Sequence, residues 1–123
     1  MKRSLSLAGF GLLAALLKLS TAFAADPTPG LEALKQLGTV NGQALACSEM
    51  PAAQRAKALM LAHSPKSETY GNAFQASTQE AFMAQTKANE PCPTAETLSE
   101  RLGTLETRLN ELLPAQAIQS THH

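Results

Sequence analysis

The chain contains two cysteines, Cys47 and Cys92, and this pair limits the possible folds more than any other feature. Two cysteines allow only one disulfide within the chain. Because that bond requires Cα atoms within roughly 7 Å of each other, the fold must bring the two positions together. The cysteines do not form a C-x-x-C motif and have no histidine beside them. We therefore predict a structural disulfide rather than a redox-active or metal-binding thiol pair.

The first 24 residues have the pattern of a secretory signal peptide. Lys2 and Arg3 give a positive start, residues 5–17 are largely apolar, and residues 22–24 (Ala-Phe-Ala) place small side chains where a cleavage site needs them. An uncleaved anchor would need about 20 apolar residues, more than this run supplies. We expect cleavage after residue 24 and a periplasmic or secreted protein without a stable membrane anchor. A disulfide is favoured in those compartments.

Loss of residues 1–24 would remove three basic residues and no acidic one. Seven basic residues then face ten acidic ones, a formal net charge of −3. A mildly acidic domain without a basic cluster is a poor ligand for nucleic acid or for an anionic membrane surface, so we expect neither partner. The remaining aromatic residues are Tyr70, Phe74 and Phe82. With so few aromatic residues, the core must be built mainly from leucine, alanine and methionine. Small domains with modest cores of this kind often need a disulfide for stability.

The pattern of apolar residues predicts one all-α helical domain over residues 25–114. Its helices are expected at about 29–48, 51–63, 65–89 and 95–113, with a flexible tail at 115–123. Proline and serine or threonine near each expected start are typical of helix N-termini; we expect Thr28, Ser64 and Thr94 to act as caps.

The first expected helix contains an unusual repeat of small residues. Gly38, Gly42 and Ala46 recur at intervals of four, beside an apolar face that includes Leu34, Leu37 and Val40. One interpretation is a helix break, because each glycine costs about 1 kcal/mol relative to alanine. The other is a smooth stripe where a second helix approaches closely. We favour the continuous helix.

The last expected helix has the clearest pattern in the chain. Five leucines alternate spacings of four and three: Leu98, Leu102, Leu105, Leu109 and Leu112. In the third helix, Tyr70, Phe74, Ala81 and, on a neighbouring flank, Phe82 form the expected apolar side. A four-helix up-down bundle places the end of its first helix beside the start of its fourth, which are the neighbourhoods of the two cysteines. Periodicity and disulfide thus predict the same fold class, a small four-helix up-down bundle stapled by one disulfide.

Residues able to carry chemistry are few. Met60 and His63 share a helix face, and thioether and imidazole ligands suit copper. The opposing interpretation is that the methionine fills space in the core and that the histidine interacts with the dipole at the end of its helix. We favour this second interpretation and predict no metal site and no cofactor. Catalysis by carboxylates would need two convergent acids, and the candidate pairs are Glu80 with Glu90 and Glu96 with Glu100. We interpret them as solvated helix faces and predict no enzyme and no catalytic residues.

In layout, the chain resembles small periplasmic acid-stress chaperones, which combine a signal peptide, about 100 mature residues, helices and two cysteines. It is also similar in outline to helical pilotins and to secretion-system immunity proteins. These resemblances concern layout rather than a shared motif, and they imply binding to another protein. We therefore expect an exported helical protein with a chaperone or adaptor role ahead of an immunity-like one. The alternative is a periplasmic carrier of a small apolar ligand or a metal.

Overall fold

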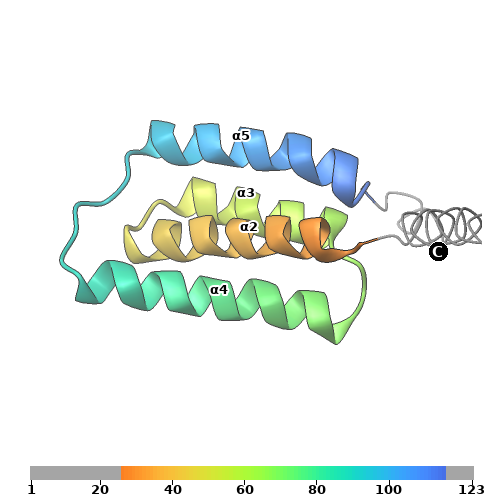
Figure 1. The fold of residues 1–123 in the computed structure, drawn as a ribbon. Coiled ribbons are helices and arrows are strands. Elements are labelled where there is room, and N and C mark those ends of the chain that lie inside the picture. The colour runs from red at the N-terminus through yellow and green to blue at the C-terminus, as the bar shows by residue number, and fades with distance from the viewer. Residues whose placement is uncertain (1–25, 116–123) are drawn as a thin grey trace, which may run out of the picture.

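The computed structural model describes residues 26–115, and the structural statements below concern that range. It contains four α-helices in the order α2 (Thr28–Ala46), α3 (Met50–His63), α4 (Glu68–Lys87) and α5 (Ala95–Leu112). Successive helices run in opposite directions, with α5 and α4 on opposite sides of the α2–α3 pair (Figure 1). The predicted all-α, up-down helical bundle is therefore confirmed. The expected signal peptide and residues 116–123 of the expected tail lie outside the described residues.

None of the four helices has the combination of length and hydropathy that a bilayer-spanning segment requires; this finding covers residues 26–115.

The leucine stripe of α5 forms one wall of the core. Leu98, Leu102, Leu105 and Leu109 are buried, as the periodicity predicts. Leu112 differs, because 37% of it is exposed. The helix ends at this residue, and Leu113, just beyond, packs against the core instead. On α2 the facing residues are Ala33, Leu34, Leu37, Val40 and Ala44, all buried.

The glycine stripe of α2 is the surface on which α4 lies. A Cβ added at Gly38 would stand 2.5 Å from the carbonyl oxygen of Phe74, and one at Gly42 would overlap the carbonyl oxygen of Thr78. Only residues without a side chain permit two helix backbones to come this close. The interpretation of the stripe as a helix contact within a continuous helix is confirmed.

The expected apolar side of α4 faces the bundle: Phe74 is buried, Tyr70 packs against the core, and Ala81 lies against Gly42 of α2. Phe82, expected on a neighbouring flank, is instead 40% exposed. The reason is that α4 packs chiefly against α2 and has little contact with α3 or α5. A helix that packs on a single neighbour buries only a narrow strip of its own surface. Helix α4 is therefore attached to the unit of α2, α3 and α5 mainly through α2.

Two of the three expected helix caps are wrong. Helix α4 begins at Glu68 rather than at Pro65, and the hydroxyl of Ser67, not Ser64, accepts a hydrogen bond from the Tyr70 amide. The hydroxyl of Ser64 instead donates a hydrogen bond to the carbonyl oxygen of Pro65.

Thr28 is the first residue of α2 rather than its cap: Pro27 holds the cap position, and no side-chain capping bond forms there. Oδ1 of the preceding Asp26 accepts a hydrogen bond of 3.0 Å from the Thr28 amide. That bond lowers the pKa of the Asp26 carboxyl below its ordinary value. The third expected cap is confirmed, because Thr94 Oγ1 accepts from the Thr97 amide at 3.0 Å.

The disulfide joins Cys47 to Cys92, which are 45 positions apart in the sequence and whose Cα atoms are 5.8 Å apart. Cys47 directly follows α2, and Cys92 lies in the segment that leads into α5. Gln85 of α4 also donates to the carbonyls of Glu90 and Pro91, which holds the same segment from the other side. The predicted bridge between the end of the first helix and the start of the last is confirmed.

Candidate functional site

Helices α3 and α4 both lie against α2 but scarcely contact each other, and a groove of about 890 Å³ separates them. We call it the apolar groove. Its lining is mainly apolar and includes side chains that water reaches freely. Leu61 is 72% exposed, Met50 46% and Phe82 40%. The remaining apolar lining residues are Leu45, Ala53, Met60 and Phe74.

The edges of the apolar groove carry uncharged amides and one cation. Gln54 and Lys57 line it from α3, and Gln75 and Gln79 line it from α4. At the bottom, Asn41 of α2 donates from Nδ2 to the hydroxyl of Thr78 at 3.1 Å. This bond satisfies the polar groups between the helices, so the floor offers apolar surface rather than unpaired donors.

The sequence contained a signal for this groove that our predictions did not use. Leu59, Met60 and Leu61 are consecutive in α3, and successive residues of a helix point about 100° apart. One core cannot cover three such side chains. Leu59 is buried, Met60 is half-buried and Leu61 is exposed. The exposed leucine therefore marks a helix face that no other element of the described chain covers.

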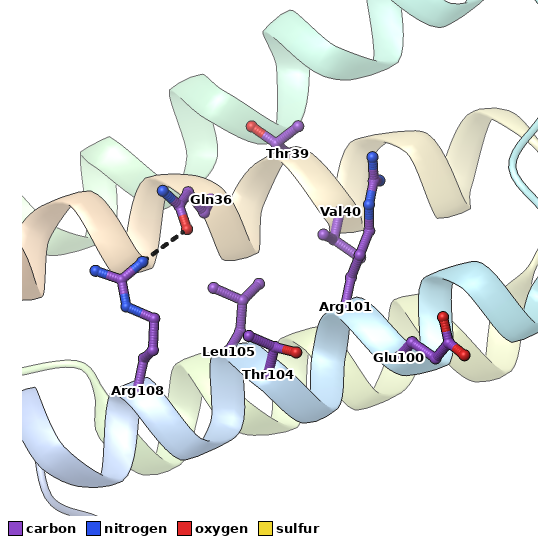
Figure 2. Close-up of a pocket in the computed structure, with 8 residues that line it drawn as sticks. All are labelled: Gln36, Thr39, Val40, Glu100, Arg101, Thr104, Leu105 and Arg108. Atoms are coloured by element: carbon purple, nitrogen blue, oxygen red, sulfur yellow. Dashed lines mark hydrogen bonds between the residues drawn. The ribbon is translucent and has the colours of Figure 1, made fainter.

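A second groove, of about 510 Å³, lies between α2 and α5, and we call it the arginine groove (Figure 2). Val40 and Leu105, both nearly buried, form its apolar floor. Arg101 and Arg108 of α5 reach toward α2 at its two ends, with Leu105 between them (Figure 2). The two grooves share α2 but use different faces of it, and they have no lining residue in common.

Each arginine of this groove is held by a glutamine of α2. Arg108 Nη1 donates to Gln36 Oε1 at 3.2 Å, the bond drawn in Figure 2. Arg101 Nη1 donates to Gln43 Oε1 in the same way. The bonds bridge α2 to α5 and fix each guanidinium, yet each uses only one of its five N–H donors. Sequence reasoning missed these pairs because their partners are 72 and 58 positions apart.

The histidine that we weighed as a copper ligand has a structural position. His63 is buried at the end of α3, and its Nδ1 lies 2.7 Å from the carbonyl oxygen of Leu113. Since a carbonyl only accepts, Nδ1 carries the proton and donates it. His63 therefore ties the end of α3 to the end of α5. Within residues 26–115 no three His, Cys, Asp or Glu side chains are placed to hold a metal ion.

The candidate carboxylate pairs are all solvent-exposed. Glu80 lies on α4 and Glu90 in the following segment, while Glu96 and Glu100 are one turn apart near the start of α5. Of the four, only Glu100 lines one of the two grooves, the arginine groove. The geometry gives no reason to assign them a catalytic role.

Comparison of the chain with family models, curated proteins and solved structures finds no match in any of the three.

Proposed function

We propose that this protein is exported and binds an amphipathic helix of another protein in the apolar groove, in a chaperone or adaptor role. The observation that carries the proposal is the groove itself: Leu61, Met50 and Phe82 present apolar surface to solvent along a channel of about 890 Å³. Exposed apolar surface that is rimmed by polar side chains is typical of interaction sites.

The dimensions of the groove favour a helix as the bound element. Its lining residues on α3 extend from Met50 to Leu61, which corresponds to about 16 Å at 1.5 Å per residue. A bound helix of about three turns would therefore run the length of the groove. Helices docked this way bury their apolar face between two helices of the receptor. Met50 and Met60 add flexible side chains that adapt to differently shaped partners.

An open channel is less suited to a small apolar ligand. Sites for small molecules enclose most of the ligand surface. The apolar groove instead leaves Leu61 72% exposed, so a small ligand there would remain partly in water. This difference supports our proposal of protein binding over the carrier alternative.

The exported location rests on residues 1–24 and on the disulfide. A bridge between Cys47 and Cys92 fits an oxidising compartment such as the periplasm. Mass spectrometry of the protein recovered from the periplasm is expected to give Ala25 as the first residue. Recovery of the exported chain with residues 1–24 still attached would contradict cleavage.

Site-specific photo-crosslinking in the producing cells tests the binding role. A photoreactive amino acid replaces Leu61 in the apolar groove or, as the control, Thr107, an exposed α5 residue outside both grooves. We expect one discrete protein adduct from position 61 and none from position 107. Phe82→Gln, at the opposite wall, should reduce the adduct while circular dichroism shows an unchanged fold.

Three results would count against the proposal. Equal adducts from both positions would mean unspecific contact. An adduct with a second copy of the chain would make the groove a dimer interface. A small lipid-like adduct would favour the carrier alternative.

A further inference from the structure

The arginine groove has a charge arrangement that the proposed function does not use. Arg101 and Arg108 are seven residues apart on α5, two helical turns, which separates them by about 10.5 Å along the axis. Within residues 26–115 neither forms an ion pair; the two pairs found there are Lys35 with Glu32 and Arg55 with Glu106. Two oriented cations without acidic partners are unusual in a domain whose expected net charge is negative.

The glutamine bonds hold these guanidinium groups in place without neutralising them. Gln36 and Gln43 accept one N–H each, which leaves the other donors of each arginine available. Guanidinium groups bind carboxylates strongly because two parallel N–H donors match the two carboxylate oxygens. Holding the group in advance also lowers the conformational entropy that binding would cost.

The groove has one acidic lining residue, Glu100, which precedes Arg101 and forms no ion pair within residues 26–115. Between the two arginines the lining is mainly apolar. Val40 and Leu105 form its floor, and Thr39 and Thr104 stand at its sides. A ligand that fits must therefore present a negative group, an apolar group and a second negative group in a line of about 10 Å. Two acidic residues seven apart on a helix, with a leucine-like residue midway, have this arrangement, because their axial rise equals that of the two arginines.

We propose that the arginine groove binds an acidic amphipathic helix of a partner protein, with one carboxylate at Arg101, another at Arg108 and an apolar side chain over Val40 and Leu105. A second copy of this chain does not fit, since no helix within residues 26–115 carries two acidic residues seven apart. Because the apolar groove lies on another face of α2, either proposal can fail while the other holds.

The test uses the oxidised protein as it is recovered after export, together with a stapled helical probe peptide of about four turns. The probe carries glutamates at two positions seven apart and a leucine four residues after the first. One control peptide has glutamine in place of both glutamates, and a second has the glutamates five apart, on different faces. Amide chemical shifts of the ¹⁵N-labelled protein report where each peptide binds.

We expect the probe to shift the amides of Thr39 and Thr104 and those of their neighbours, and to bind more weakly as salt is raised. Arg101→Gln and Arg108→Gln should each weaken binding roughly two- to fivefold, as is usual for exposed charge pairs. Lys87→Gln removes one positive charge at the end of α4, outside both grooves, and should leave the affinity unchanged.

Other outcomes would overturn the proposal. Equal binding of the glutamine peptide would show that the carboxylates are not recognised, and equal binding of the five-residue spacing would remove the geometric argument. Chemical-shift changes confined to residues of the apolar groove would show that the probe binds there and not in the arginine groove. If Arg101→Gln and Arg108→Gln lower the thermal midpoint but leave probe affinity unchanged, the arginines serve only to tie α2 to α5.

Discussion

Gly42 of α2 lies directly against Thr78 of α4, so close that a Cβ at position 42 would overlap the Thr78 carbonyl oxygen. Added atoms there would also come within 2.8 Å of the Phe82 amide nitrogen. Both neighbours belong to the backbone, which a rotamer change cannot move aside. Because α4 packs chiefly on α2, this contact sets the position of α4 and, with it, one wall of the apolar groove.

Gly42→Ala is therefore expected to destabilise the protein by about 1–3 kcal/mol, the usual cost of overpacking, and to loosen α4. Gly71→Ala is the matched control on α4, because a Cβ there meets nothing within 4 Å. It should instead stabilise by about 0.5–1 kcal/mol, since alanine is the better helix former. Urea unfolding of both variants measures the difference. A Gly42→Ala protein as stable as the wild type would show that the helices are not in this close contact.

The leucines of α5 allow a second comparison within one helix. Leu102 is fully buried, whereas Leu112 is 37% exposed. Leu102→Ala should cost about 2–5 kcal/mol because it removes buried apolar surface and leaves a cavity. Leu112→Ala should cost about 1 kcal/mol or less. Equal urea midpoints for the two variants would mean that the regular leucine repeat, rather than the observed helix end, describes the core.

His63 provides a third prediction, at the opposite end of the bundle from the disulfide. His63→Ala removes the donor to the Leu113 carbonyl, and we expect a loss of about 1–3 kcal/mol. Leu61→Ala, at an exposed position in the same turn, should change stability by about 0.5 kcal/mol or less. In the wild type, ¹⁵N NMR should find the imidazole proton on Nδ1. A proton confined to Nε2 would rule out the bond to Leu113.

Patterns within single helices predicted the fold class well. The leucine spacing of α5 identified four buried residues, and the glycine spacing of α2 identified a close helix contact. Both work because the helical repeat alone determines which residues share a face. The disulfide could be predicted because two cysteines permit one pairing.

The candidate sites depend on relations between helices, which local patterns do not contain. Phe82 lies on the expected apolar flank of α4, yet it is exposed because α3 and α4 stay apart. In the sequence, Arg101 has the pattern of a solvent-exposed charge. Only the fold brings Gln43 close enough to accept its hydrogen bond. Ser64 and Ser67 are both suitable caps, and only the path of the chain between α3 and α4 selects Ser67.

The bundle topology, and with it the arginine groove between α2 and α5, depends on the bridge that holds the start of α5 beside the end of α2. Unfolding of the disulfide variants is therefore the most direct test. Closing a loop of this length should stabilise the protein by about 4 kcal/mol, and less if the reduced unfolded chain keeps residual structure. The urea midpoints of Cys47→Ser, Cys92→Ser and the double variant should fall by the same amount as on reduction, because each removes the same bond. Two free thiols in the oxidised wild type, or single losses that add in the double variant, would contradict the bridge and the bundle topology built on it.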